Sequence, residues 1–445
     1  MQYLTIWDVV LTPIYLMVLT FIAKWWRDKK YPKGHPLRRY YLPGLYVKFA
    51  SVIFIALVYQ YYYGYGDTLG YFQHSQIINS ALGDSFNTWF KLVTRQSWIS
   101  NPELYPYVSE MFYYNFPDSH IVASISAVLG LLNGTTYIPI ALLFAFLAYT
   151  GIWAMYKTFV SIFPQLHKQL AFAFLFIPST FVWGSGIFKD TICLFALGWL
   201  TYSTFRIFIN KDLSIKNLLF LFVSFYLLAI VKIYILLAFV PALCLWLLMT
   251  YSGKIRNSAI RWFANILCVA LVLLAFNFFA SRFSTELNEY SLEKIAQTAE
   301  ITSEYVIYMS GDEGSAYNIG KFEPTLSGLV KKFPMAVTVT LFRPFPWEAR
   351  KLIVLLPALE ALLFLLLTLV VIFKLNRSAI KGILKDPTII FCLIYSLIFA
   401  FAVGMSTGNF GTLSRYKIPC LPFYALALIL IYFHHSAAGR KTAAG

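Results

Sequence analysis

Residues 24–39, KWWRDKKYPKGHPLRR, separate two long apolar stretches near the start of the chain and hold seven basic residues against one acid. The apolar stretches cover about residues 4–22 and 43–64, and a bilayer crossing needs roughly 17–25 apolar residues in a helix. Short loops with an excess of Lys and Arg lie on the cytoplasmic side of a membrane. This stretch therefore predicts a cytoplasmic hairpin between two transmembrane helices, with the amino terminus outside.

The composition of the whole chain agrees with this hairpin. Of 445 residues, 59% are hydrophobic and 13% are charged, whereas a soluble domain has about 25% charged residues. We therefore exclude a water-soluble fold and predict an all-α polytopic membrane protein, with one transmembrane domain over 1–435 and a polar tail over 436–445. Nine further apolar segments bring the number of crossings to about eleven: 136–156, 169–184, 190–206, 217–231, 233–251, 262–280, 352–373, 388–404 and 418–434.

If residues 24–39 are placed inside, simple alternation of the spans puts most of the loops rich in Lys and Arg on the cytoplasmic side. The cytoplasmic loops then carry 21 basic and 3 acidic residues, and the extracytoplasmic segments carry 14 basic and 15 acidic residues. We expect a multi-pass protein of the plasma or inner membrane, with its carboxyl terminus in the cytoplasm. The net charge of +16 then reflects contact with anionic membrane lipids, and nothing in the sequence indicates a nucleic-acid partner.

Two extracytoplasmic loops, residues 65–135 and 281–351, are too long to be simple connections. Apolar residues at near-helical spacing predict interfacial helices within them. In the first loop these cover about 77–90 and 120–132, the second being too short to cross. In the second loop, we predict a charged surface helix over 286–304 and an interfacial helix over 326–341 that is interrupted at Pro334.

Asp67 is the first candidate for catalysis. It stands in YGDTLGY, residues 65–71, where the second span leaves the membrane. A carboxylate at that interface can reach a lipid headgroup and take a proton from a sugar hydroxyl, as a general base does. The alternative interpretation is that Asp67 caps the helix that follows. The residue alone does not separate the two.

A second group of candidates lies in WGSGIFKDT, residues 183–191, between two predicted spans. The glycines allow a tight turn, Lys189 offers a cation for phosphate, and Asp190 offers an acid for hydroxyl groups or a metal. Lys232 stands in a similar position between two later spans. Charges at this depth are often functional, although a snorkelling Lys and an Asp at a helix start would explain them without a function.

Two further segments place basic residues on the extracytoplasmic side. In FRPFPWE, residues 342–348, Arg343 and Glu348 flank a proline-rich turn, and Arg can hold phosphate in a fork that Lys cannot match. An aromatic belt explains the Phe and Trp residues of this segment but not its charges. In NFGTLSRY, residues 409–416, Arg415 lies outside against the general trend, so we expect an anion beside it.

Together these segments resemble the GT-C class of membrane glycosyltransferases. The shared features are an acid after an early span, a first outer loop rich in surface helices, a charged turn ending in Asp190, and Arg415-Tyr416 before a final helix with a proline. Enzymes of that class take a sugar from a polyprenyl-phosphate carrier on the extracytoplasmic face. The resemblance implies that Asp67 is the base and that Asp190 occupies the place of a further acid. Residues 342–348 and 409–416 also resemble segments of bacterial membrane proteins from polysaccharide loci.

Two features depart from the pattern of that class. An extra helix precedes the span that leads to Asp67, and no Asp-x-Asp pair follows it. The second departure argues against an obligatory metal. We therefore predict no metal ligands and no certain cofactor, and leave a divalent metal open.

The expected reaction is an inverting hexosyl or pentosyl transfer. Asp67 would deprotonate a hydroxyl of an extracytoplasmic glycan, lipid or protein acceptor, and this hydroxyl would displace a polyprenyl phosphate. Basic groups around the phosphate would stabilise its developing charge, and the candidates are Lys189, Lys232, Arg343 and Arg415. The expected acceptor-side or supporting residues are Asp190, Glu348, Tyr416, Tyr71, Glu110, Asp118 and His120, although a lone His is more often structural.

Two alternatives compete with this interpretation. A polysaccharide polymerase or ligase also joins lipid-linked glycans outside the membrane and would hold a pyrophosphate with arginines. A lipid-linked-oligosaccharide flippase or another transporter is less favoured, because transporters show inverted repeats and broken helices near the midplane. In this chain the polar residues gather on one face.

Overall fold

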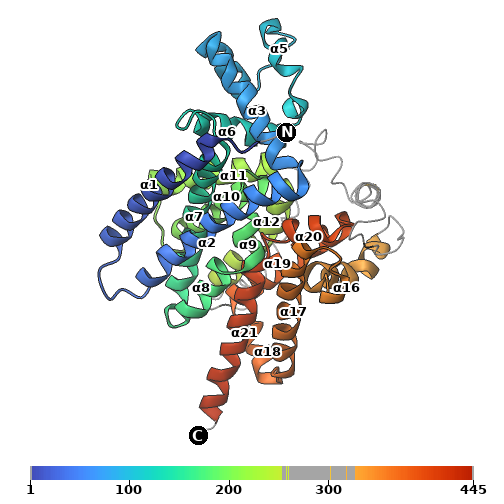
Figure 1. Cartoon of the computed structure of the whole chain (residues 1–445). Coiled ribbons are helices and arrows are strands. Elements are labelled where there is room, and N and C mark those ends of the chain that lie inside the picture. Colours follow the sequence, from blue (N-terminus) through green and yellow to red (C-terminus); the bar gives the residue numbers. More distant parts are fainter. Residues whose placement is uncertain are drawn as a thin grey trace. The chain divides into compact units, whose positions relative to one another are not determined.

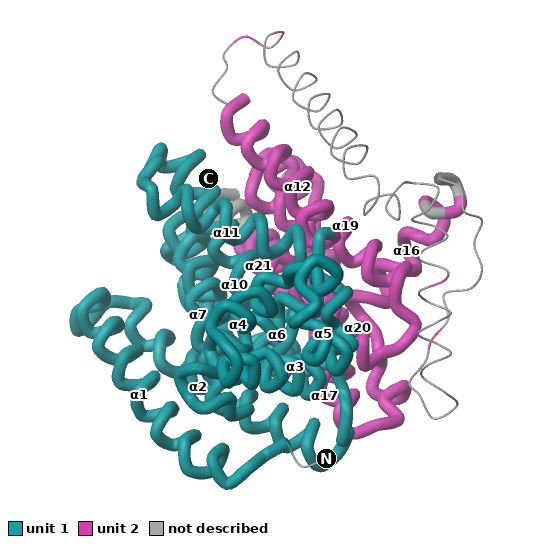
Figure 2. The backbone as a smooth tube through the Cα atoms, turned by 90° about the horizontal axis from the view of Figure 1, so that it is seen from above, with its two compact units in different colours: residues 1–233 teal, residues 234–445 magenta. Residues whose placement is uncertain are grey.

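The structure is a computed structural model that describes residues 3–252 and 326–442. It also describes four single residues, Asn257, Ala259, Ile301 and Tyr317. Every element in these ranges is a helix (Figure 1). The chain divides into two compact units, residues 1–233 and 234–445 (Figure 2). That residues 1–435 form one continuous membrane domain stays a prediction.

The first unit joins long apolar helices through shorter ones. Its long helices are α1 (Ile6–Lys30), α2 (Arg38–Val58, continued by a π-helical turn over Tyr59–Tyr63), α7 (Tyr137–Ile162), α10 (Lys189–Thr204, continued by a π-helical turn over Phe205–Ile209) and α11 (Ile215–Val231). Its shorter helices are α3 (Asp67–Ser80), α4 (Phe86–Val93), α5 (Tyr105–Val108), α6 (Pro117–Gly130), α8 (His167–Leu175) and α9 (Pro178–Trp183). Helix α7 packs against α1, α2, α8 and α10 and buries most of its side chains, so it forms the centre of this unit.

The second unit contains α12 (Ile233–Ser252), α16 (Leu326–Phe342), α17 (Leu352–Phe373), α18 (Arg377–Ile383), α19 (Pro387–Ser406), α20 (Phe410–Tyr416) and α21 (Leu421–Thr442). Helix α19 packs against α16 and α21. A Cβ at Gly404 of α19 would lie 2.2 Å from the backbone oxygen of Ala336 in α16. The close approach of these two helices therefore depends on a glycine.

The described helices confirm a helical protein of the multi-pass membrane type. Seven are long and apolar enough to cross a membrane: α1, α2 with its π-helical turn, α7, α10 with its π-helical turn, α12, α17 and α19. An eighth crossing results if α20 and Leu421–Phe433 of α21, which are bent by 69°, form one broken span. Helix α11 is apolar but shorter, and the predicted span over 262–280 lies outside the described residues. The count of eleven thus stays a prediction.

The predicted span over residues 169–184 is wrong as a single helix. The chain forms α8 and α9 instead, with Pro178 at the first position of α9. A proline disfavours the helical conformation of the residue before it, and Ile177 is extended, with ψ of 119°. Helices α8 and α9 have 9 and 6 residues, so neither crosses a membrane by itself.

The predicted first extracytoplasmic loop contains α3 to α6. The predicted surface helix over 77–90 is wrong as one helix, because α3 ends at Ser80 and α4 begins at Phe86. Ser85 caps α4 by accepting a hydrogen bond from the Thr88 N–H at 3.0 Å, and such a cap favours a new helix start. The predicted short helix over 120–132 is confirmed by α6, which has 14 residues.

The second outer loop is described only in part. Its helix over 326–341 is confirmed by α16, but the predicted interruption at Pro334 is wrong, since the helix continues through this residue. Helix α16 packs against α17 and α19. The predicted helix over 286–304 falls outside the described ranges.

Asp8, a charged residue inside the first predicted span, has a structural role. Its Oδ1 accepts a hydrogen bond from the Ile138 N–H at 2.8 Å, and its Oδ2 accepts one from the Thr5 N–H at 2.9 Å. Both amides belong to helix starts, where N–H groups lack partners within the helix. Asp8 therefore joins the beginnings of α1 and α7.

Candidate functional site

Asp67 is the first residue of α3, and the N-cap position belongs to Gly66. Gly66 has φ of +133°, and a Cβ there would lie 2.6 Å from Cε1 of Tyr59, so only glycine fits without displacing the ring. Asp67 therefore does not occupy the N-cap position itself. In the first turn, its partly exposed carboxylate lies where the helix dipole stabilises negative charge.

The ring of Tyr113 covers the face of α3 on which Asp67 lies. Its centroid is 5.2 Å from the ring of Tyr71 and 5.0 Å from the ring of His74. A Cβ at Gly70 would lie 2.8 Å from Cε2 of Tyr113, so this glycine makes room for the ring. Residues 67, 70, 71 and 74 share one helix face. Burial and the nearby negative charge of Asp67 raise the pKa of Tyr113.

Sequence reasoning predicted a role for Asp67 and Tyr71 but missed Tyr113. The signal in the sequence was Gly70, a small residue between larger ones on the helix face of the acid. It indicates that something approaches this face closely, but it does not say what. Tyr113 is 46 positions later in the chain than Asp67, so only the fold brings them together.

The glycine-rich turn over residues 184–188 is held by Lys48, a buried residue of α2. Its Nζ donates hydrogen bonds to the Gly184 oxygen at 2.6 Å and to Ser185 Oγ at 3.1 Å. A Cβ at Gly184 would lie 2.3 Å from Cδ1 of Leu194 and 2.6 Å from the Thr180 oxygen. The predicted tight turn is confirmed. Nothing in the sequence indicated that Lys48, which lies within the predicted span 43–64, takes part in this turn.

Lys189 and Asp190 form the first turn of α10 and point to different partners. Lys189 Nζ donates a hydrogen bond to Asp118 Oδ2 of α6, in an ion pair whose side chains are 20% and 42% exposed. Lys232 Nζ donates to Asp190 Oδ1 at 2.5 Å, and these side chains are only 7% and 1% exposed. One pair thus lies at the surface of the first unit and the other in its interior.

Helix α6 connects the two parts of this site within the first unit. It packs against α3, which carries Asp67, and against α10, which begins with Lys189. Asp118 stands in its first turn. The structure therefore links the face under Tyr113 to the start of α10 through one short helix.

Arg343 is the centre of a cluster in the second unit. Its guanidinium donates hydrogen bonds to the carboxylate of Glu348, one of them from Nε at 3.1 Å. Its Cζ lies 5.1 Å from the ring centroid of Phe410 and 5.7 Å from that of Tyr317. The buried Lys417 donates to its backbone oxygen at 3.4 Å. The pKa of Glu348 lies below its ordinary value, because the bonds from Arg343 and from the Phe345 N–H outweigh the opposing effect of burial.

The remaining predicted residues lie in varied surroundings. Arg415 and Tyr416 end α20 and are half-buried, and Glu110 is exposed. His120 is 2% exposed, and its Nε2 lies 2.9 Å from the backbone oxygen of Leu92. Burial lowers its pKa to about 4. This favours the structural alternative for His120.

Three of the four predicted phosphate ligands are thus paired with predicted supporting acids: Lys189 with Asp118, Lys232 with Asp190, and Arg343 with Glu348. Asp67 belongs to the first unit, and Arg343 and Arg415 belong to the second. That these residues converge on one phosphate stays a prediction. In the described ranges, no three His, Cys, Asp or Glu side chains are placed to hold a metal ion together.

The described fold and these groups define a helical multi-pass membrane protein with an acid beside an aromatic ring and with charged pairs at helix ends. Comparison of the chain with protein-family models, with curated proteins and with solved structures gave no match.

Proposed function

We propose that this protein is a membrane glycosyltransferase that uses a polyprenyl-phosphate-linked sugar, with Asp67 as the general base. The observation that carries the proposal is the position of Asp67 on one helix face with Tyr113 lying over it. A sugar presents an apolar C–H face that packs on an aromatic ring, and hydroxyl groups that hydrogen-bond to a carboxylate. An acid beside a ring, next to the end of an apolar helix, suits a lipid-linked sugar and its acceptor.

In the proposed reaction, Asp67 removes the proton from the acceptor hydroxyl. The hydroxyl oxygen forms a bond to the anomeric carbon while the bond from that carbon to the phosphate oxygen breaks. The polyprenyl phosphate leaves with the electron pair, and the anomeric configuration inverts. A cation near the leaving phosphate stabilises its charge, most strongly where water is excluded.

The ion pairs refine the choice of that cation. Lys189 is the best candidate in the first unit, because its pair with Asp118 is partly exposed and a phosphate can replace the carboxylate. Lys232 is buried with Asp190, so we assign this pair to positioning α10. Arg343 and Arg415 stay candidates in the second unit. There the guanidinium of Arg343 forms a cation–π contact with the ring of Phe410.

The proposal includes the predicted topology. The catalytic groups act on the extracytoplasmic face of the inner or plasma membrane, with the amino terminus outside, the carboxyl terminus in the cytoplasm and about eleven crossings. The excess of basic residues in 24–39 supports this orientation. Labelling of single cysteines at exposed positions 33 and 110 with a membrane-impermeant reagent tests it, since only position 110 should react from outside.

The decisive experiment is sugar transfer in proteoliposomes from a radiolabelled polyprenyl-phosphate-sugar. Asp67→Asn should lower the transfer rate by about 10²–10⁴-fold, the usual contribution of a general base, while donor binding is retained. Glu103→Gln is the matched control, because Glu103 is an exposed acid of the same loop that pairs with Lys91. Transfer at the normal rate by Asp67→Asn would refute the assignment.

A substitution of Tyr113 tests the aromatic wall separately from the base. Tyr113→Phe keeps the ring and should keep most activity. Tyr113→Ala removes the stacking surface and should raise KM more than it lowers kcat. Equal effects of the two variants would instead assign the role to the hydroxyl group.

One observation favours a second candidate, a transporter of lipid-linked sugars. The pair of Asp190 and Lys232 is buried, and Lys232 lies at the break between α11 and α12, with φ of −152°. Broken helices and buried charges are typical of transport pathways. The same proteoliposomes separate the two functions: movement of the donor across the bilayer without any transfer supports the transporter.

A further inference from the structure

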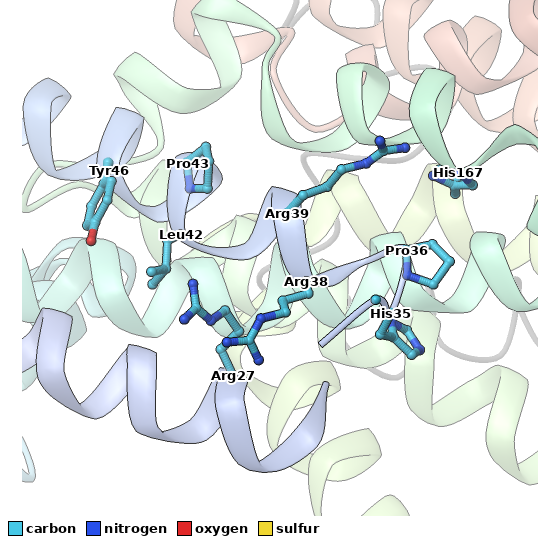
Figure 3. Close-up of a pocket in the computed structure, with 10 residues that line it drawn as sticks. Arg27, His35, Pro36, Arg38, Arg39, Leu42, Pro43, Tyr46 and His167 are labelled. Atoms are coloured by element: carbon cyan, nitrogen blue, oxygen red, sulfur yellow. The ribbon is translucent and has the colours of Figure 1, made fainter. Parts of the chain in front are cut away.

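An open pocket of about 770 Å³ lies at the hairpin between α1 and α2, in the first unit (Figure 3). Its polar wall contains Arg27, Arg38 and Arg39 together with His35 and His167. The arginines come from the end of α1 and the start of α2. The stretch that defines the first hairpin in the sequence thus also forms a concave basic surface.

Positive charge in this pocket exceeds negative charge. Arg27 and Arg38 both bind the same carboxylate, Asp28, with Nη2 to Oδ1 distances of 2.6 and 2.7 Å. Arg39 is exposed and lies over the ring of Tyr40, at 4.8 Å from its centroid. No carboxylate in the described ranges forms an ion pair with Arg39. Among the described residues, two of the three guanidinium groups therefore share one acid, and the third, that of Arg39, has no ion pair.

The arginines of the pocket point in different directions. Figure 3 shows Arg27 and Arg38 near one another, whereas Arg39 extends toward His167. The pKa of His167 lies below its ordinary value, through burial first and then through the positive charges of Arg39 and Lys168. Arg39 is therefore the cation nearest to His167 in this pocket.

The other wall of the pocket is apolar. Leu42, Pro43 and Tyr46 follow Arg39 along α2 and line the pocket. These residues begin the part of α2 that is apolar enough to cross a membrane. A ligand in the pocket would therefore meet cations at one end and an apolar helix surface at the other, as a phospholipid requires.

The depth of the pocket fits the level of lipid headgroups. Residues 38–63 form one continuous helical run of 26 residues, which spans roughly 39 Å at 1.5 Å per residue. A bilayer with its headgroups is about 40–45 Å thick. The pocket lies at the start of this run and Asp67 follows its end, so the pocket belongs at the headgroups of the leaflet opposite to Asp67.

We propose that this pocket binds the phosphate of an anionic phospholipid, with Arg39 as its main ligand and with Leu42 and Tyr46 against the glycerol and the first carbons of the acyl chains. Guanidinium groups bind phosphate oxygens through paired, charge-assisted hydrogen bonds. The excess positive charge selects an anionic over a zwitterionic lipid. The site is independent of the proposed glycosyl transfer.

The test is lipid binding to the full chain in detergent, measured by native mass spectrometry with phosphatidic acid and with phosphatidylcholine. Phosphatidic acid should bind more tightly than phosphatidylcholine, and Arg39→Gln should weaken it by roughly tenfold, the loss of one charge-assisted contact. Lys33→Gln is the matched control, because Lys33 is an exposed basic residue of the same loop that does not line the pocket. It should leave binding unchanged.

Two further experiments test whether the phosphate belongs to a lipid and whether the guanidinium geometry of Arg39 is needed. Inorganic phosphate at millimolar concentration should not displace the lipid; displacement would assign the pocket to free phosphate and overturn the proposal. Arg39→Lys keeps the charge but not the fork, and it should lie between the wild type and Arg39→Gln. Equal binding of both lipids, or equal loss in Arg39→Gln and Lys33→Gln, would also overturn it. Because Arg39 forms no ion pair in the described ranges, Arg39→Gln should stay folded, which size-exclusion chromatography checks.

Discussion

Lys189 and Asp190 are neighbours in the chain, yet their ion pairs lie in opposite surroundings. Lys189 meets Asp118 where both side chains keep contact with the surface, whereas Asp190 meets Lys232 in the interior. An exposed pair contributes little to stability, because water and salt weaken it. A buried pair is costly to form but much more costly to break, because one charge is then left alone in a medium of low polarity.

This contrast indicates that the two ion pairs at the start of α10 have different roles. Under the proposed function, the buried pair positions α10, and the exposed pair leaves a lysine that can exchange its carboxylate partner for a phosphate. Successive residues of a helix point in different directions, because a turn contains 3.6 residues. The tight turn over 184–188 that leads into α10 is joined to α2 by Lys48. Substitutions at each of these places should therefore differ in size and in kind.

The largest effect should come from Lys232→Met, which leaves the buried Asp190 without the ammonium group. Breaking a buried pair costs roughly 3–5 kcal/mol, so the yield of folded protein and its unfolding temperature in detergent should both fall strongly. The double variant Lys232→Met with Asp190→Leu removes both charges and should recover most of the loss. A double variant as unstable as the single one would show that the cost is not electrostatic.

Gly184→Ala should have the second largest effect. The added Cβ would lie 2.3 Å from Leu194 Cδ1 and 2.6 Å from the backbone oxygen of Thr180, and overpacking of this kind costs roughly 1–3 kcal/mol. Because the turn positions both ion pairs, sugar transfer should fall together with thermal stability. Gly83→Ala is the control, since a Cβ at Gly83 meets nothing within 4 Å. Equal unfolding temperatures for the two variants would contradict the role of the turn.

The pair of Arg343 and Glu348 lies between the two extremes, with side chains 22% and 21% exposed. Glu348→Gln should cost roughly 1.5 kcal/mol, at the low end for hydrogen bonds to charged groups. Since the folded state lowers the pKa of Glu348, its stabilisation is present above the pKa of the unfolded chain and is lost as pH falls through the folded value. Unfolding temperatures of wild type and Glu348→Gln should therefore converge on acidification; a constant difference would exclude ionisation as the cause.

The smallest change in stability should come from Lys189→Met. An exposed pair contributes about 0.2–1 kcal/mol, and its contribution should shrink further in 1 M salt, where charges are screened within about 3 Å. Transfer activity should fall far more than stability if Lys189 holds the donor phosphate. Asp118→Asn removes the same pair but keeps the lysine, so it should retain activity. Loss of activity in both variants alike would assign the pair a structural role.

The broad fold was readable from the sequence because membrane helices need long apolar segments. The runs near residues 4–22, 136–156 and 352–373 all appear as α1, α7 and α17. The wrong predictions concern helix breaks, which the length and composition of an apolar segment do not determine. The run over 169–184 is apolar enough but breaks before Pro178, and the helix over 326–342 continues through Pro334, where packing outweighs the lost hydrogen bond.

The candidate site was readable only as a set of residue types. Asp67, Lys189, Asp190 and Arg343 stand out because charges beside apolar helices are costly. Which partner each one has was not readable. The number of charges that the fold buries was not readable either. The buried charged residues include Asp8, Lys48, Asp190, Lys232, Glu360 and Lys417.

By itself, the sequence determined that this protein is a helical membrane protein and that residues 24–39 form a basic hairpin. Hydrophobic length and loop charge are local properties, and the bilayer acts on them directly. Only the tertiary structure decided that Tyr113 lies over the helix face of Asp67, that Lys189 and Asp190 take different partners, and that the arginines of the hairpin line a pocket. These are contacts between residues far apart in the chain, and packing alone selects among the many partners that their chemistry allows.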